Sequence, residues 1–346
     1  MAEVNIATNI WTALVADTLA GRQDILNPAY KLFEQDQNIL GAKAGKFNWI
    51  LNASMLKSMN NITNTTTLTS NSIAQKEMEG IIIRRGDSFA ETNVRRLLSG
   101  DNQLNLALAQ ELTGVIASQV ADDLASTLTG AFASATATPL IIDLSTIVGN
   151  GSMITDANIP NIISGAYPNM NRSVMTTLIC HPDVYDNITA NIAKGYQIQD
   201  YIIGNLTLPR IKGLNIVYNA QLCKKLPAVE AVVGVPANGE TPAIEAVVGK
   251  PERYTSYLCA DNAFGYNLQR PMEIYTSFDE KVGGGTHNVT YYANYAVAPK
   301  NTIWEGSNES PSKAALETST NWSWGYHDIQ KVPLRQIVST ITPVTK

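Results

Sequence analysis

Histidine is the side chain best suited to acid–base catalysis or metal binding near neutral pH, and the chain has three: His181, His287 and His327. His181 directly follows Cys180. Neighbouring residues of a strand point to opposite faces, so a catalytic Cys–His pair is not expected. His287 and His327 have no metal-ligating residue three or four positions away. The sequence therefore predicts no catalytic residue, no metal site and no cofactor, and hence no enzyme.

Two other patterns resemble chemical sites without meeting their requirements. The three cysteines, at positions 180, 223 and 259, are too widely spaced for a disulfide framework or a Cys-x-x-Cys zinc site. The run Gly283-Gly284-Gly285-Thr286 lacks the Gly-x-x-x-x-Gly-Lys-Ser/Thr frame of a phosphate-binding loop, and no strong helix signal follows it. A flexible turn is the favoured interpretation of this run.

Four arginines lie within thirteen residues of an otherwise sparsely charged chain: Arg84, Arg85, Arg95 and Arg96. One interpretation is a subunit-contact patch, whose charge-assisted hydrogen bonds reach acidic residues of a neighbour. The other is a solvated face with weak ion pairs. Together with Trp49, an apolar anchor of the preceding segment, the four arginines are the candidate assembly-interface residues.

Composition bounds the class of protein. Of the 346 residues, 45% are apolar, which is enough for a real core, and the length predicts roughly two domains. Only 16% are charged, so Asn, Thr, Ser and Gln must supply a surface that suits burial against other protein. The net charge of -5 argues against a nucleic-acid reader. No signal peptide and no run of 18 apolar residues occurs, so we expect a chain made in a cytoplasm, with no membrane partner.

The clearest predicted element is a helix over residues 101–130. Asp101 or Asn102 can cap its N-terminus, and Gly130 is placed to end it. Its apolar residues recur at steps of three and four: Leu104, Leu108, Leu112, Val115, Ile116, Val120, Leu124 and Leu128. At 1.5 Å per residue this helix is about 40 Å long, so it should span the molecule.

Three segments depend on another surface or project from the core. Residues 1–40 mix short helical signals with turns, which predicts an arm that lies on another surface. Residues 41–83 are rich in Thr and Asn and predict a long hairpin or extended loop that a neighbour orders, the alternative being a disordered linker. The segment at 227–234 recurs 15 positions later at 242–249 and predicts an inserted hairpin over 227–249 with an Asn-Gly turn at its tip.

Helix and strand signals alternate along the rest of the chain and predict a mixed α and β class. A loop is expected over 307–319. Helices are expected over 155–163 and 182–193, and strands over 174–180, 214–218, 272–278, 289–298 and 333–341.

Residues 84–132 resemble the centre of tailed-phage major capsid proteins, in which an extended loop leads through a turn to an Ala-Leu-Ala-containing spine helix. The matching motifs are Arg85-Gly86, Ser99-Gly100-Asp101 and, at the end of the helix, Gly130-Ala131-Phe132. The stretch therefore covers a loop, a turn and a helix in the order that this family has them.

Two later stretches resemble the same family. Residues 155–188 are similar to a helix and a strand followed by a His-Pro-x-Val-Tyr turn, which here begins at His181. Residues 208–222 are similar to a short strand, a glycine and a new strand. The resemblance covers about residues 40–300, and the stretches follow the family's order.

The resemblance implies an α+β fold of the Hong Kong 97 type, with an N-terminal arm, an extended β-hairpin loop, a long spine helix and a mixed-sheet axial domain. The arm would be residues 1–40, the loop 41–90, and the peripheral domain 91–150 with the spine helix at 101–130. The axial domain plus returning peripheral strands would be 151–346, with the hairpin insertion at 224–253.

The same resemblance implies a structural protein that forms hexamers and pentamers and closes into the icosahedral head of a tailed phage around double-stranded DNA. The implied partners are other copies of the chain, a portal protein, and scaffolding or decoration proteins. The implied location is the virion, with assembly in the bacterial host cytoplasm. Two alternatives stay open: the shell protein of an encapsulin-type bacterial compartment, and a phage tail structural protein.

Overall fold

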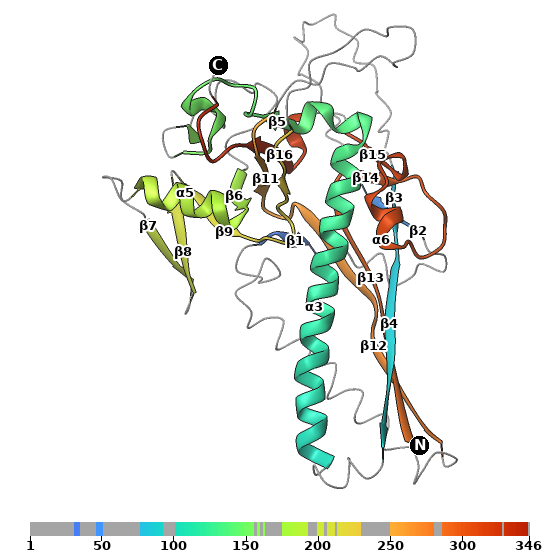
Figure 1. Cartoon of the computed structure of the whole chain (residues 1–346). Helices are drawn as coiled ribbons and strands as arrows, with labels where there is room; N and C mark the ends of the chain where they lie inside the picture. The colour runs from blue at the N-terminus through green and yellow to red at the C-terminus, as the bar shows by residue number, and fades with distance from the viewer. Residues whose placement is uncertain are drawn as a thin grey trace, which may run out of the picture. The chain divides into compact units, whose positions relative to one another are not determined.

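The computed structural model describes residues 31–34, 46–50, 77–92, 101–155, 158–159, 162, 175–192, 199–203, 206–211, 213–229, 250–279, 286–326 and 329–344. Helices and strands are mixed, as predicted, and the chain divides into two compact units (Figure 1). Unit 1 comprises residues 1–22, 33–137 and 264–332, and unit 2 comprises 23–32, 138–263 and 333–346. Each unit is thus built from segments far apart in the sequence.

Unit 1 is organised around one long helix and one long β-hairpin. Helix α3 (Asp101–Ala133) begins where predicted and is about 50 Å long. It contacts strand β13 (Thr286–Pro299), whose antiparallel partner is β12 (Phe264–Asp279). The hairpin is flanked by β4 (Ile83–Thr92), antiparallel to β13, and by β1 (Phe33–Glu34), parallel to β12. The strands predicted over 272–278 and 289–298 are confirmed, and each is longer than expected.

Burial of α3 changes along its length. From Val120 to Phe132 almost every side chain is buried, which is typical of a helix inside a core. Val115 belongs to the same predicted apolar stripe but is 46% exposed. The predicted end at Gly130 is wrong: the helix continues to Ala133, because this glycine packs closely against another element instead of capping the helix.

A second hairpin lies within the segment predicted to be a hairpin or extended loop. Strand β2 (Lys46–Ile50) pairs antiparallel with β3 (Glu77–Ile81), and Trp49 stands opposite Met78 in the register. The connection, residues 51–76, lies outside the described residues. Two paired strands of the predicted hairpin are therefore present.

The last part of the sequence of unit 1 forms short elements that lie beside α3. Strand β14 (Thr302–Trp304) pairs antiparallel with β15 (Trp322–Trp324). The predicted loop over 307–319 is wrong, because it contains helix α6 (Lys313–Glu317). The Ser312 hydroxyl caps this helix by accepting a hydrogen bond from a backbone N–H, and at five residues the helix is too short to produce a periodic apolar pattern.

Unit 2 contains an eight-stranded mixed sheet in the order β5-β16-β11-β6-β9-β8-β7, with β10 paired to β11. Two neighbouring pairs are parallel, β5 with β16 and β6 with β9, and the others are antiparallel. The strands are β5 (Ile141–Asp143), β6 (Met175–Cys180), β7 (Gln199–Ile203), β8 (Leu206–Ile211), β9 (Leu214–Tyr218), β10 (Lys225–Leu226), β11 (Arg253–Ala260) and β16 (Leu334–Ser339). The predicted strands over 174–180, 214–218 and 333–341 are confirmed.

The predicted helices of this unit are also present in the described part. Helix α5 (Pro182–Ile192) begins with proline in its first turn, where the missing N–H has no intrahelical partner to lose. Ile159 N donates to Thr155 O and Ile162 N donates to Asn158 O, which are the i→i−4 bonds of the helix predicted over 155–163. Short 3-10 helices cover Ala135–Leu140, Asn150–Ser152, Ser319–Asn321 and Ile329–Lys331 across the chain.

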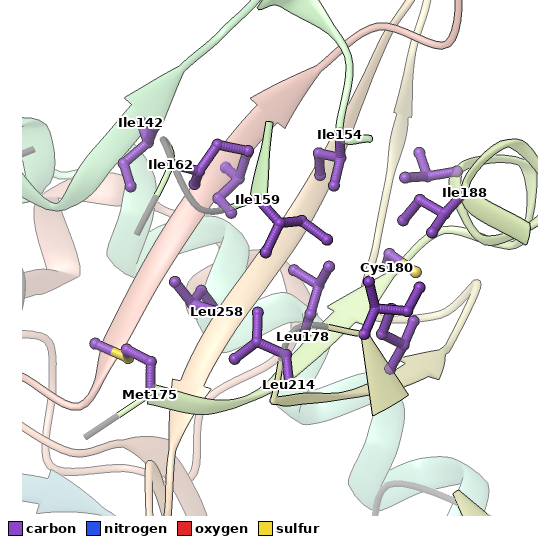
Figure 2. Packing of buried hydrophobic residues seen from close by; sticks show 14 of the residues in the cluster. Ile142, Ile154, Ile159, Ile162, Met175, Leu178, Cys180, Ile188, Leu214 and Leu258 are labelled. Carbon is purple, nitrogen blue, oxygen red and sulfur yellow. The ribbon is translucent and has the colours of Figure 1, made fainter. Parts of the chain in front are cut away.

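One apolar cluster forms the core of unit 2 between the sheet and α5 (Figure 2). Leu178 and Leu258 come from neighbouring central strands, and Ile188 comes from α5. Ile154 and Ile159 approach from the segment before β6, and both side chains are buried. Strands whose residues are buried on both faces read as continuous apolar runs, which explains why the run at 174–180 was recognisable in the sequence.

Some predicted features fall outside the described residues: the arm up to residue 30, Arg95 and Arg96, and residues 230–249 of the repeat hairpin. The foot of that hairpin is described. Val229 and Lys250 form an antiparallel bridge, and β10 pairs with the start of β11. These pairs join the two ends of the predicted insertion.

Candidate functional site

Arg85, one of the candidate interface residues, lies in β4 and binds a buried carboxylate of α3. Its Nε donates to Asp123 Oδ2 at 3.0 Å and its Nη2 donates to Asp123 Oδ1 at 2.8 Å, a bidentate ion pair. The Tyr295 hydroxyl, from β13, donates to Asp123 Oδ2 at 2.5 Å. Asp123 and Tyr295 are buried, whereas the Arg85 side chain is 25% exposed. One carboxylate thus joins three elements of unit 1.

The electrostatics of this cluster follow from its burial. Burial and the negative charge of Asp123 raise the pKa of the Tyr295 hydroxyl, so that the phenol stays protonated and remains a donor. A buried carboxylate without partners would be strongly unfavourable, and here the guanidinium supplies the compensating charge. The arrangement holds strands and helix together.

Arg84 and Arg85 also connect β4 to the segment before α6. The backbone N–H of Arg84 donates to Ser310 Oγ at 2.9 Å, and Arg85 Nη1 donates to the Pro311 carbonyl at 2.9 Å. Gly86 follows, and a Cβ at that position would lie 2.7 Å from the Tyr291 carbonyl oxygen. The Arg-Gly pair singled out in the sequence is therefore an anchor followed by a close approach of two strands.

Of the five candidate interface residues, the structure describes Trp49, Arg84 and Arg85. Arg84 is exposed and Arg85 is bound to Asp123, while Trp49 lies in β2. Their participation in contacts between copies stays a prediction. Sequence reasoning missed the partners, Asp123 and Tyr295. One feature of the sequence could have indicated Asp123: it is a carboxylate within the most apolar part of the predicted helix, where a charged group needs a partner.

Three tryptophans close around the C-terminal end of α3. Trp322 Nε1 donates to the Leu316 carbonyl and Trp324 Nε1 donates to the Ala131 carbonyl, so both buried indoles are hydrogen-bonded. Trp304 packs edge-on against Trp322, with ring centroids 4.8 Å apart. This cluster fixes α6 and β15 against the helix.

At the strand-to-helix turn, Cys180 and His181 have different partners. The Cys180 thiol points to the Val217 carbonyl at 3.6 Å, whereas His181 Nδ1 accepts a hydrogen bond from the Asp183 backbone N–H at 3.1 Å. The imidazole packs on the Tyr254 ring, with centroids 5.1 Å apart. His181 therefore caps the first turn of α5, a structural role.

A small polar cluster fixes the foot of the insertion beside this turn. Lys225 Nζ lies 3.0 Å from Glu252 Oε1, and the Tyr254 hydroxyl donates to Glu252 Oε2 at 2.9 Å. Hydrogen bonding to Glu252 raises the pKa of Lys225, and the same bond lowers the pKa of Glu252. Burial raises the pKa of Tyr254 to about 12, so its hydroxyl remains a donor. The contacts join β10 to β11 and stabilise the stem.

All three cysteines are buried, and burial predicts that their thiols react slowly in the native protein. Burial raises the pKa of Cys180 to about 12, and it also raises the pKa values of Cys223 and Cys259. Near neutral pH these thiols therefore stay protonated, and the thiolate is the reactive form. We expect a disulfide reagent such as DTNB to label the native protein very slowly and to titrate three thiols in denaturant. Rapid labelling of a thiol in the native protein would contradict this.

Within the described part of the chain, no group of three or more His, Cys, Asp or Glu side chains is arranged to hold a metal ion. Among the described helices, none is long and apolar enough to cross a membrane.

No protein-family model and no curated protein matches the chain. Among solved structures it is similar to the capsid of cyanophage Pam1, at 10% identity over 90% of this chain and 89% of that one, with a TM-score of 0.48. The capsid of Helicobacter pylori bacteriophage KHP30 is similar at 11% identity over 92% of both chains, with a TM-score of 0.49. The holo-SrpI encapsulin complex from Synechococcus elongatus is similar at 9% identity over 96% of both chains, with a TM-score of 0.47.

Proposed function

We propose that the chain is the major capsid protein of a tailed phage and assembles into an icosahedral shell around double-stranded DNA. The observation that carries the proposal is the burial of α3, whose apolar stripe is buried from Val120 to Phe132 but exposed at Val115. An exposed apolar side chain in line with a buried stripe is a site that a neighbouring copy can cover.

The lengths of the elements support the same proposal. Helix α3 has 33 residues, and strands β12 and β13 have 16 and 14, against ordinary means of about 11 for a helix and 5–6 for a strand. Long elements that pack on few neighbours expose much surface for the core that they enclose. Lateral contacts between copies would bury that surface, and obligate interfaces of about 2,000–5,000 Å² are of the required size.

The sequence stretches favour this family over other assembling proteins. Those at 84–132, 155–188 and 208–222 resemble tailed-phage capsid proteins and follow that family's order. In the proposed fold of the Hong Kong 97 type, α3 is the spine helix, the β2/β3 hairpin belongs to the extended loop, and unit 2 corresponds to the axial domain.

Five residues are proposed to contribute to the contacts between copies: Trp49, Arg84, Arg85, Arg95 and Arg96. Of the two described arginines among these five, Arg84 is the stronger candidate, since its side chain is exposed, whereas the Arg85 guanidinium is bound to Asp123. Hexamers and pentamers of the chain, a portal protein and scaffolding or decoration proteins complete the proposed assembly. It would form in the cytoplasm of a bacterial host.

Electron microscopy of the purified chain tests this function directly. Negative staining is expected to show closed shells of uniform diameter, and sedimentation is expected to place most of the protein in them. Tubes would instead favour a tail protein, and a monodisperse small particle under all assembly conditions would overturn the proposal. Shells that enclose a cargo enzyme rather than DNA would favour an encapsulin-type compartment.

A further inference from the structure

We infer that Arg253 is an anion-binding residue, and that it takes a carboxylate from an acidic segment of a partner protein. Arg253 is the first residue of β11, in the stem of the insertion, which consists of residues 224–229 and 250–255. The proposed shell function does not require this site, and the inference does not depend on that function.

The pairing of the two strands decides which side chains of the stem share a face. Lys225 stands opposite Tyr254 in the antiparallel register. The next pair is Leu226 and Arg253. Successive residues of a strand point to opposite faces. Lys225 and Tyr254 therefore lie on one face of the stem, and Leu226 and Arg253 lie on the other.

The face that carries Lys225 compensates its own charges. Lys225 Nζ lies 3.0 Å from Glu252 Oε1 and 3.9 Å from Asp183 Oδ2. The same ammonium group lies 5.6 Å from the centroid of the Tyr254 ring. The cation and both carboxylates are thus paired within the chain, and this face needs no external ion.

Arg253, on the other face, has no hydrogen-bond partner among the residues that the structure describes. Its Nε is buried and unpaired there, although the residue as a whole is only partly buried, which leaves part of the side chain open to a ligand. By comparison, Arg85 Nε donates to Asp123 Oδ2 at 3.0 Å. Arg210 Nε donates to Asn215 Oδ1 at 2.8 Å. A partly desolvated charge without an acceptor is unfavourable, so Arg253 is poised to bind an anion.

The chemistry of the guanidinium group selects an oxyanion. Its planar fork of N–H donors matches a carboxylate or a phosphate with two parallel hydrogen bonds. Because Arg253 is already partly removed from water, such a pair is stronger than an ion pair between fully exposed side chains. One acidic side chain of a partner is therefore enough to make a specific contact.

The surroundings of Arg253 favour a polypeptide as the source of that oxyanion. The alternation along the stem places Leu226, Ala228 and Pro251 on the same face, and these apolar residues suit contact with a protein segment. Lys224 belongs to this face as well and adds positive charge. Two cations on a chain with a net charge of -5 are too few for DNA, whose binding requires many neutralised phosphates.

Fluorescence anisotropy with a labelled poly-glutamate peptide tests the site on the full-length chain. The unmodified chain is expected to bind the peptide, and Arg253→Gln is expected to bind it at least about tenfold more weakly, because a charge-assisted contact is lost. The substitution removes no hydrogen bond within the described part of the chain, so the variant should fold normally. Circular dichroism and urea unfolding check this.

Lys250→Gln is the matched control. Lys250 is an exposed cation of the same stem, and its odd spacing from Arg253 places it on the opposite face. The variant loses the same charge, yet its affinity for the peptide is expected to stay within about twofold of that of the unmodified chain. Equal losses in the two variants would reveal a general electrostatic attraction and overturn the inference.

Other outcomes would also overturn the inference. One is the absence of peptide binding by the unmodified chain, and another is full binding by Arg253→Gln. A labelled DNA duplex that binds Arg253 more tightly than the peptide does would assign the site to nucleic acid. Peptide binding that appears only after Glu230→Gln and Glu245→Gln would assign it to acidic residues of the insertion itself. None of these outcomes bears on shell formation, which electron microscopy tests separately.

Discussion

Replacing Gly130 by alanine is expected to destabilise unit 1 by about 3 kcal/mol, although alanine is the better helix former. A Cβ at position 130 would lie 2.1 Å from the Leu316 carbonyl oxygen and 2.7 Å from Cδ1 of Trp322. Neither neighbour can move easily, because the Trp322 indole is hydrogen-bonded to that same carbonyl. The methyl group must therefore push α6 away from α3. Urea unfolding monitored by tryptophan fluorescence measures the loss of stability.

Gly114 supplies the matched control within the same helix. A Cβ there meets nothing within 4 Å, so Gly114→Ala adds helix propensity without a clash. This variant is expected to be more stable than the unmodified chain, by up to about 1 kcal/mol. The two identical substitutions should thus have opposite signs. If Gly130→Ala is also stabilising, the packing of α6 and Trp322 on the helix is wrong.

Asp123→Ala is expected to destabilise the chain by about 3 kcal/mol, the lower end of the range for breaking a buried ion pair. The substitution leaves the buried Tyr295 hydroxyl without its acceptor and the Arg85 guanidinium without its countercharge. Because the Arg85 side chain is 25% exposed, water can solvate part of its charge and limit the loss. Unfolding in urea at neutral pH gives the difference in free energy.

Two comparisons show whether that loss comes from the buried cluster. Asp87→Ala removes an exposed carboxylate from the strand that carries Arg85, and it is expected to change stability by less than about 1 kcal/mol. In a double-mutant cycle, Arg85→Ala should add much less destabilisation to Asp123→Ala than it causes alone, since the two groups act on each other. Additive effects would contradict a direct ion pair.

The sequence predicted the elements whose signal is local and repeated. Helix α3 was recognisable because apolar residues recur from Leu104 to Leu128, and β6 because its buried run is continuous. Gly130 was misread because a glycine near the end of a helical pattern looks the same whether it caps the helix or admits a neighbour. Helix α6 is too short for a periodic signal.

The candidate site was predicted only in part, because its partners are distant in the sequence. Arg85 stood out among the arginines, but Asp123 is 38 positions away and Tyr295 lies 172 positions beyond Asp123. Nothing in a single sequence links three such residues. The order of the strands in each sheet was not predictable for the same reason: paired strands are distant in the sequence. Strand β4, for example, pairs with β13, and the chain passes through unit 2 between them.

Because each unit combines segments from distant parts of the chain, its folding during synthesis on the ribosome is delayed. Strand β4 ends at Thr92 and its partner β13 begins at Thr286, so the 193 intervening residues, at about 5–20 residues per second, separate the syntheses of the two strands by about 10–40 s. Unit 2 cannot complete its sheet earlier, because β16 lies between β5 and β11 and is made last. Neither core can close until translation is nearly over. The nascent chain therefore carries exposed apolar segments through most of its synthesis, and we expect it to be a client of ribosome-associated chaperones.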